Sequence, residues 1–292
     1  MNEKYAWKLI FEQECIDRRT TYQFFDNGKQ KGCLSRVWER YTHSLSESDA
    51  ALINVDIQTS CSKIVRLGNY GEGGWDICGD DFQPNVMLRS SLQNDESLDP
   101  RIAHPCRVYS FGINDDPSFD KDLVRRWPSC TIYAFDPSIG RNTGDDFLGP
   151  NIKFYNIGLG GFNKHKGGWH VMTLDSIMKM LNHDHVNLVK MDIEGWEWET
   201  FLSWEKSGVY KKIGQLVGEI HFFNNMKSEK FIIEEQVSIL RLFHDTFGFH
   251  VFRRRNNFRF TTPIDLYYSK NEAKPIRTNS CLEIGWRRSK EI

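Results

Sequence analysis

Short apolar runs alternate with helical patterns over most of the second half of the chain. Each run is followed by glycine, aspartate or proline residues, which is typical of a buried strand that ends in a turn. Between the runs, apolar residues recur at the spacing of one helix face. This alternation predicts an α/β fold with a doubly wound, mostly parallel sheet. The predicted strands are 107–111, 131–135, 152–157, 186–191 and 213–223, and the predicted helices between them include 118–127 and 174–181.

The N-terminal part of the chain has different patterns. Residues 1–60 carry two helical patterns, and residues 63–78 carry two short alternating runs around a glycine-rich turn, which predicts a hairpin. The polar stretch 84–105 lacks a period and is interpreted as a linker. We therefore expect two parts: an N-terminal helical arm with the hairpin at 1–100, and the main domain at 101–292.

The C-terminal part begins with a long helix predicted at about 229–246. The apolar runs after it predict antiparallel strands that close the sheet. The arginines between 253 and 259 could bind an acidic substrate, or they could lie on a solvated strand face. The predicted closing strands are 249–255, 264–268 and 281–286.

Composition leaves the compartment open. The chain has 292 residues and a formal net charge of −1, so no overall field favours nucleic acid or an anionic membrane. No apolar run approaches the roughly 20 residues of a membrane span. Glu3, Glu12 and Glu14 stand where a signal segment would have its apolar core, so we expect a soluble chain with no signal segment. The seven cysteines lack zinc-site spacing, and they are compatible with a disulfide framework or with buried thiols.

Two carboxylates follow the predicted strand 186–191. In open α/β sheets, ligands bind just beyond the carboxyl ends of the strands, so Asp192 and Glu194 lie where a cofactor and a substrate could meet. The alternative is that both residues only cap the following helix. Glu219 and His221 on the next predicted strand could add metal donors, but the chain lacks an established metal-ligand spacing, so we expect no metal site.

A glycine and an acidic residue end the first two strands of the main domain. Asp136 follows Gly112 by 24 positions, close to the spacing at which a carboxylate reaches the ribose hydroxyls of an adenosine-containing cofactor. The glycine would let the backbone approach that ligand. NAD is disfavoured because Asn114 and Pro117 stand where its fingerprint needs glycines, and the glycine-rich turn at 68–74 lacks the ending of a P-loop.

Several motifs in order resemble the FkbM-type S-adenosylmethionine-dependent methyltransferases. The resemblance covers about residues 61–286 and is closest to an animal methyltransferase-like subgroup whose human relative is the twenty-fourth of that name. The motifs are Val108-Tyr109-Ser110-Phe111-Gly112, Ala134-Phe135-Asp136-Pro137-Ser138, Gly158-Leu159-Gly160, Thr173-Leu174-Asp175-Ser176 and Leu188 to Glu197, with Arg66-Leu67-Gly68, Gly73-Gly74-Trp75 and Cys281-Leu282-Glu283-Ile284 also similar to the subgroup.

The resemblance implies a seven-stranded, Rossmann-like class I methyltransferase fold that binds S-adenosylmethionine. The chain departs from the family at Ile113 and Asn114, where a second glycine is usual. The subgroup suggests a secreted or secretory-lumen protein, and a cytoplasmic one is the alternative. The implied cofactor positions are Phe111 and Gly112 at the methionine end, Asp136 at the ribose, Asp192 at the methyl centre, and also Asn114 and Gly158.

The leading hypothesis is an O-methyltransferase that acts on a small molecule, a glycan or a protein. Such a reaction needs a positioned hydroxyl and a base, and Asp192, Glu194 and His221 are the available bases. We favour His221 as the base or as the residue that orients the hydroxyl, because the unperturbed pKa of imidazole lies near neutral pH, with Asp192 as its partner or as a substrate contact. One alternative is a binding module that keeps the fold without turnover. A nucleic-acid methyltransferase is disfavoured, because the chain lacks both a basic excess and the Asn/Asp-Pro-Pro-aromatic motif of base methylation.

Overall fold

The computed structural model describes two separate units of the chain. Contacts group the chain into Met1–Ser46 and Glu47–Ile292. In the first unit, β1 (Gln23–Asp26) and β2 (Lys29–Cys33) form an antiparallel hairpin, and the helical patterns expected within residues 1–60 lie outside the described residues. The described residues are 23–26, 29–33, 59–71, 73–82, 105–166, 168–221, 230–256, 263–266, 276–279 and 281–288.

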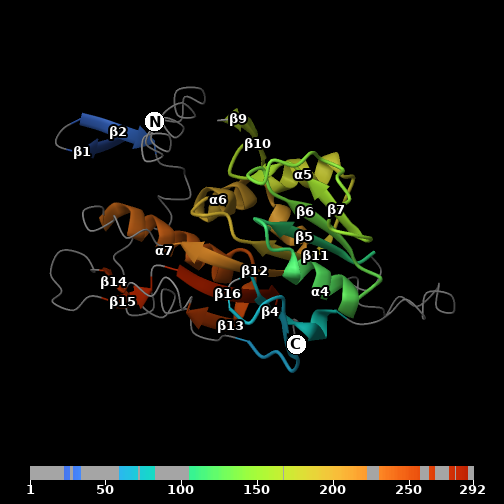
Figure 1. Cartoon of the computed structure of the whole chain (residues 1–292). Helices are drawn as coiled ribbons and strands as arrows, with labels where there is room; N and C mark the ends of the chain where they lie inside the picture. The colour runs from blue at the N-terminus through green and yellow to red at the C-terminus, as the bar shows by residue number, and fades with distance from the viewer. Residues whose placement is uncertain are drawn as a thin grey trace, which may run out of the picture. The chain divides into compact units, whose positions relative to one another are not determined.

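A seven-stranded sheet forms the centre of the second unit (Figure 1), with the order β13-β16-β12-β11-β5-β6-β7. All neighbouring pairs from β12 to β7 are parallel, and β16 runs antiparallel to both β12 and β13. This confirms the doubly wound, mostly parallel seven-stranded sheet. The strands are β5 (Arg107–Phe111), β6 (Thr131–Phe135), β7 (Ile152–Tyr155), β11 (Val186–Met191), β12 (Ile213–His221), β13 (Phe249–Asn256) and β16 (Cys281–Arg288).

The parallel strands end together at one edge of the sheet. Phe111 pairs in register with Met191 on one side and with Phe135 on the other, and Phe135 pairs with Tyr155. The rings of Phe111, Phe135 and Tyr155 stack in a row on one face, with centroids 4.6 and 5.1 Å apart. Strand β12 continues past this edge to His221, because Met191 already pairs with Gly218.

Helices cover both faces of the sheet. Helix α4 (Ser118–Arg126) packs through Phe119 and Leu123 on one face, and α5 (Leu174–Met180), α6 (Glu197–Ser207) and α7 (Lys230–Asp245) lie on the other. Figure 1 shows α4 on the opposite side of the strands from α5 and α6. No helix in the described part of the chain is long and apolar enough to cross a membrane.

Smaller sheets complete the unit. The segment between β7 and α5 forms β8 (Gly158–Leu159), β9 (Lys164–Lys166) and β10 (Trp169–Met172). The predicted strand at 264–268 was expected to close the main sheet, and this was wrong. Strand β14 (Pro263–Leu266) pairs instead with β15 (Ile276–Asn279) in a separate two-stranded sheet, and β13 and β16 close the main sheet.

The predicted hairpin at 63–78 is confirmed as β3 (Ile64–Leu67) and β4 (Trp75–Cys78), followed by the 3-10 turn η1 (Gly79–Asp81). The side chain of Gln215 on β12 accepts from the Cys78 N–H at 2.8 Å and donates to the Cys78 carbonyl at 3.1 Å. These bonds hold the hairpin on the same face as α4, within the second unit. The domain boundary predicted after residue 100 stays a prediction.

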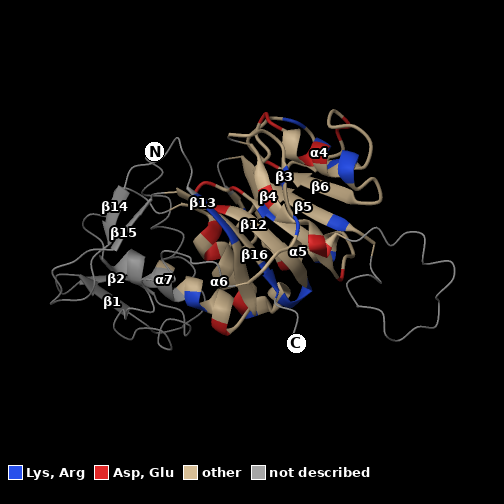
Figure 2. Ribbon diagram, turned by 90° about the horizontal axis from the view of Figure 1, so that it is seen from below, with Lys and Arg blue, Asp and Glu red and all other residues tan. Residues whose placement is uncertain are grey.

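Disulfides link Cys61 to Cys78 and Cys106 to Cys130, and Cys281 is a free, buried thiol. Of the two readings that composition left open, the disulfide framework therefore applies to these four cysteines, and the buried thiol applies to Cys281. Figure 2 shows basic and acidic residues interspersed over the described elements.

Candidate active site

The loop after β5 is pressed against the end of β11. Gly112 has a backbone φ of +69°, in the left-handed region that glycine tolerates best. A β-carbon at this position would overlap the carbonyl oxygen of Asp192, and the Asp192 N–H donates to the Phe111 carbonyl at 3.2 Å. The sequence suggested that this glycine makes room for a ligand. The structure gives another reason for it, which is the close approach of two strand ends.

Asn114 supplies what a second glycine would supply in this loop. Its φ is +47°, and asparagine is among the few residues other than glycine that adopt this conformation readily. The Asn114 N–H donates to Oδ2 of Asp136 at 2.8 Å, which ties the loop to the end of β6. The departure from the family motif therefore preserves the backbone conformation of the turn.

Asp136 lies at the junction of the loop and β6 and is only 4% exposed. Its Oδ1 accepts from the Ser138 N–H at 2.8 Å and from the Ser138 hydroxyl at 2.6 Å. A carboxylate has about four acceptor positions, so three are used within the protein and one is left for a ligand hydroxyl. The remaining acceptor position of Asp136 fits a ribose hydroxyl of an adenosine-containing cofactor.

Two other predicted cofactor residues are placed differently from each other. The Phe111 side chain is 1% exposed within the aromatic stack, so only its backbone could face a ligand. Gly158 on β8 lies against the Asp136-Pro137 segment, since a β-carbon there would be 3.2 Å from Cγ of Pro137. Gly158 is thus close to the junction, whereas the Phe111 ring belongs to the core.

His221, at the end of β12, is separated from this loop by β11 and lies in a cluster of carboxylates. Its Nδ1 is 3.0 Å from Oε1 of Glu197, and its Nε2 is 3.7 Å from Oε2 of Glu194 and 4.0 Å from Oδ1 of Asp192. The indole N–H of Trp198 donates to the His221 carbonyl at 3.0 Å, which fixes the end of β12. The three catalytic residues expected from the sequence are therefore brought together, on the same edge as the Gly112 loop.

The electrostatics of the cluster change the role of His221. Burial alone would lower the pKa of His221, but hydrogen bonds with Cys281 and Glu197 and the charge of Glu197 outweigh burial and raise this pKa to about 12. The ring is therefore positively charged at neutral pH, and both of its nitrogens carry a proton that can be donated. Of the two roles that the sequence left open for His221, base or orienting residue, its surroundings suit an orienting donor, which leaves Asp192 or Glu194 to accept a proton.

The two carboxylates after β11 face the solvent more than His221 does. The side chain of Asp192 is 28% exposed and that of Glu194 is 86% exposed. Glu194 has a φ of +54°, a conformation that is strained for glutamate. Among the described residues, none donates a hydrogen bond to the buried Oδ1 of Asp192. Asp192 thus offers an unused acceptor beside the charged ring of His221.

Sequence reasoning missed Glu197, which is fully buried. Its Oε1 also accepts from the Ile193 N–H at 3.3 Å, so the residue joins the strand end to the ring of His221. A glutamate at the start of a helix is usually a cap, and for that reason its position carried no functional signal. Cys281 was missed as well, since only the register of β16 with β12 places it opposite His221.

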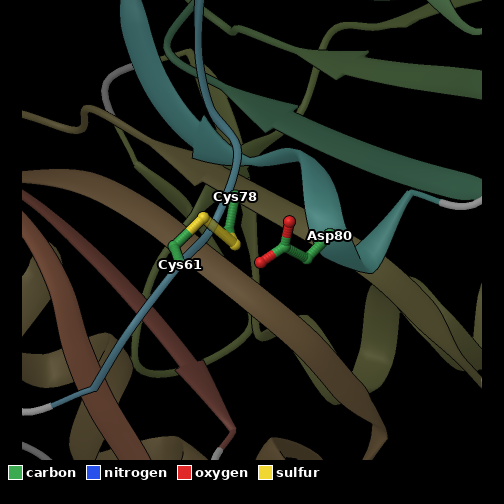
Figure 3. Close-up of side chains that lie close together, drawn as sticks. All are labelled: Cys61, Cys78 and Asp80. Carbon is green, nitrogen blue, oxygen red and sulfur yellow. A yellow bond between two sulfur atoms is a disulfide. The ribbon is translucent and has the colours of Figure 1, made fainter.

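Three groups of side chains have potential metal-donor atoms within 4.8 Å of one another: Asp192, Glu194 and His221; Glu219, His221 and Cys281; and Cys61, Cys78 and Asp80. The last group is shown in Figure 3 and is not a metal site, because its two sulfurs form a disulfide and Asp80 accepts from the Ser62 N–H and hydroxyl, each at 2.7 Å. The first two groups share His221.

Two features considered from the sequence have structural roles. Arg253 donates to Oδ2 of Asp76 at 2.7 Å, and Arg255 lies 3.8 Å from Oδ1 of the same carboxylate. These arginines therefore fasten the hairpin to β13, although the sequence allowed them to bind an acidic substrate. Trp75, in a motif similar to the resembled subgroup, is 4% exposed and belongs to the core under the hairpin.

A family model described as a methyltransferase domain matches residues 37–271. Among curated proteins, the chain is similar to the probable methyltransferase-like protein 24 of Homo sapiens, with 22% identity over 223 residues, which covers 73% of this chain and 55% of that protein. The Rattus norvegicus counterpart is 23% identical, with 71% and 60% covered. The chain thus spans little more than half the length of these relatives. The finer FkbM-type assignment stays a prediction.

Solved structures are similar at low TM-scores. The Methanococcus jannaschii fibrillarin pre-rRNA processing protein has a TM-score of 0.38 and 15% identity, with 63% of this chain and 66% of that chain covered. The SAH-bound form of CalO1, a methyltransferase in calicheamicin biosynthesis, has a TM-score of 0.27 and 11% identity, with 63% and 49% covered. The fold is assigned by the strand order of the central sheet and not by these overlaps.

Proposed function

The chain belongs to the methyltransferase domain family, and on this premise we propose that it transfers a methyl group from S-adenosylmethionine to a hydroxyl group of a small molecule, a glycan or a protein. The observation that carries the proposal is the position of two sets of side chains at one sheet edge. Asp136 and the loop at Gly112 lie on one side, and the cluster around His221 lies on the other.

The residues proposed to hold the cofactor are Asp136, Asn114 and the backbone of Gly112. Asp136 would accept hydrogen bonds from the ribose hydroxyls, for which its carboxylate has a remaining acceptor position. Asn114 and Gly112 would present the turn of the loop to the methionine end. When bound, S-adenosylmethionine supplies a methyl group on a positively charged sulfur, which is open to displacement by an oxygen.

The carboxylates after β11 would prepare the acceptor. The charged ring of His221 would orient the acceptor hydroxyl by donating from Nε2, while Glu197 holds Nδ1. Asp192, which has an unused buried oxygen, would take the proton as the hydroxyl oxygen attacks. Glu194 is the second candidate for this proton, because its Oε2 lies 3.7 Å from Nε2 of His221, in the same group of side chains as Asp192.

The direct test is transfer of radiolabelled methyl groups. The purified chain would be incubated with labelled S-adenosylmethionine and with panels of glycans, phenols and peptides, and calorimetry would measure binding of the homocysteine product. We expect binding together with label in one acceptor class. Absence of cofactor binding would contradict the proposal. Binding without transfer to any panel would favour the alternative of a module that keeps the fold without turnover.

We also propose that the protein is located in an oxidising compartment. Disulfides persist in oxidising compartments, and two of them fasten the hairpin and the start of β5 in this chain. They support a secreted or secretory-lumen location rather than the cytoplasmic alternative. Alkylation of the protein from its native source before and after reduction would check this, and free thiols at Cys61 and Cys78 before reduction would argue for the cytoplasm.

A further inference from the structure

A lysine is buried in the middle of the sheet, under the loop at Gly112. Lys190 lies on β11 between Ser110 of β5 and Val217 of β12, and it is 5% exposed. Buried lysines are rare because removing an ammonium group from water is costly unless it is paired. A sequence that places one here therefore needs compensating partners, and those partners indicate what the residue does.

The partners of the ammonium group are backbone carbonyls of the loop. Nζ of Lys190 donates to the carbonyl of Phe111 at 3.0 Å and to the carbonyl of Gly112 at 2.6 Å. The ring of Trp75 from the hairpin lies 5.3 Å from Nζ, which is a favourable place for a cation. The lysine thus binds the two consecutive residues at which the chain turns out of β5.

Holding these carbonyls fixes the direction of the N–H groups that follow them. The described peptide bonds are trans, so each N–H points away from the carbonyl of the same peptide unit. The Gly112 N–H accordingly reaches the Phe135 carbonyl at 3.0 Å, and the Ile113 N–H points away from the lysine. Together with the bond from Asn114 to Asp136, this holds the loop at each residue of its turn.

Neighbouring groups support the lysine from the side of α4. Asp120 on this helix is 1% exposed; burial raises its pKa to about 6, and the nearby Lys190 opposes that rise. The hairpin contributes further contacts, because Asn69 donates to Asp116 at 2.8 Å and the Gly68 N–H donates to Asp122 at 3.0 Å. The loop is therefore supported by groups of α4 and of the hairpin.

We infer that Lys190 is a positioning residue for the cofactor loop, whose ammonium group holds the carbonyls of Phe111 and Gly112 so that the loop is already formed when S-adenosylmethionine binds. The inference rests on the proposed function for the identity of the ligand. Its structural content, a loop held by one buried cation, can be measured without any cofactor. Preorganisation of this kind raises affinity by reducing the ordering cost of binding.

The test replaces the ammonium group with a side chain of similar length, as Lys190→Met. Two readouts are compared with the wild type: amide hydrogen exchange at residues 112–117 without cofactor, and calorimetric affinity for S-adenosylmethionine. We expect exchange at least about threefold faster and affinity at least about tenfold weaker, since charge-assisted hydrogen bonds are lost. Lys190→Gln keeps a neutral donor and serves as a second variant that is less disruptive to folding; it should fall between wild type and Lys190→Met.

Gln215→Leu is the matched control. Gln215 is also fully buried and lies on the neighbouring strand, but its partners are the Cys78 backbone in the hairpin and the Asp81 side chain that follows it. This control should lower the melting temperature while leaving exchange at 112–117 and cofactor affinity within about twofold of wild type. Unchanged exchange in both lysine variants, or an equal change in the control, would overturn the inference. A wild type that fails to bind cofactor while the exchange result holds would overturn only the proposed function.

Discussion

The candidate site has two sides, one at the ends of β5 and β6 and the other at the ends of β11 and β12, and they are built in opposite ways. On the side of β5 and β6, Asp136 and Asn114 are bonded to each other, and the loop carbonyls accept from Lys190, which reaches them from β11. On the side of β11 and β12, Glu194 is largely exposed and Asp192 keeps a buried oxygen to which no described residue donates a hydrogen bond. The first side is bonded within the protein except for one acceptor position of Asp136, whereas the second has a buried carboxylate oxygen to which no described residue donates. This difference separates a preformed binding surface from a surface on which a substrate would react.

The largest expected effect concerns the reactive side. His221→Ala should lower kcat by at least about 100-fold, because it removes the group that orients the acceptor hydroxyl. Cofactor affinity should stay within about threefold, since the Gly112 loop is held by other residues. Methyl transfer and calorimetry measure the two quantities. His244→Ala, at an exposed histidine paired with Asp245, is the control and should change neither.

The opposite result would break the comparison. If His221→Ala weakened cofactor binding as strongly as turnover, the two sides would act as one surface. His221→Gln then offers a finer test, because it retains a donor without the charge. We expect this variant to recover part of the lost rate if orientation is the main role of His221.

The stability of the preformed side should depend on pH through Asp120. Its pKa in the folded protein is raised by burial from 3.8 to about 6. The unfolded chain therefore releases this proton at lower pH than the folded protein, and the free energy of unfolding falls as pH rises from about 4 to about 6. The difference between the two pKa values corresponds to about 3 kcal/mol of the free energy of unfolding. This contribution is present below about pH 4 and is lost fully above about pH 6.

Asp120→Asn would isolate this contribution. The amide resembles the protonated carboxyl, so the variant should be more stable than wild type at pH 7.5 and should lose that advantage near pH 4. Thermal unfolding at both values measures the difference. An advantage of equal size at both values would show that the proton on Asp120 is not responsible.

A smaller effect is expected from Asp136→Ala. The variant loses both the bond to the Asn114 N–H and the proposed bonds to ribose, so affinity for S-adenosylmethionine should fall at least about tenfold. Asp136→Asn keeps the shape of the side chain and loses its charge, and it should have an intermediate effect. Calorimetry on the folded variants, with circular dichroism as the check of folding, measures both. Equal binding by Asp136→Ala would remove the assignment.

The outline of the preformed side could be predicted from the sequence, and its support could not. The apolar runs predicted β5 and β6, and the spacing of Gly112 and Asp136 placed their ends side by side, because parallel strands bring their carboxyl ends to one edge. Lys190 was hidden within an apolar strand run. A pattern of apolar residues cannot show that a single lysine in it reaches two carbonyls on the next strand.

The sequence predicted which residues form most of the reactive side, but it did not predict their electrostatics. Asp192, Glu194 and His221 follow from strand order, but Glu197 and Cys281 enter the cluster only through the docking of α6 and the register of β16. These two residues raise the pKa of His221, and so they decide that its ring is charged. The role of a titratable residue depends on such neighbours, which sequence spacing does not reveal.

The smallest expected effect sharpens the comparison at Asn114, which takes the position of the usual second glycine. If the left-handed backbone is what the loop requires, Asn114→Gly should keep the equilibrium constant of unfolding and the cofactor affinity each within about twofold of wild type. The reason is that glycine adopts the φ of +47° without strain. Asn114→Val should be worse on both measures, since a residue with a β-branched side chain pays roughly 1–2 kcal/mol in this conformation. The Asn114 side chain is exposed, so neither change disturbs the core. Melting temperature and calorimetry would rank the three proteins. A loss of affinity in Asn114→Gly equal to that in Asn114→Val would mean that the amide side chain itself contacts the cofactor, and the loop would then act through side-chain contact rather than through its backbone alone.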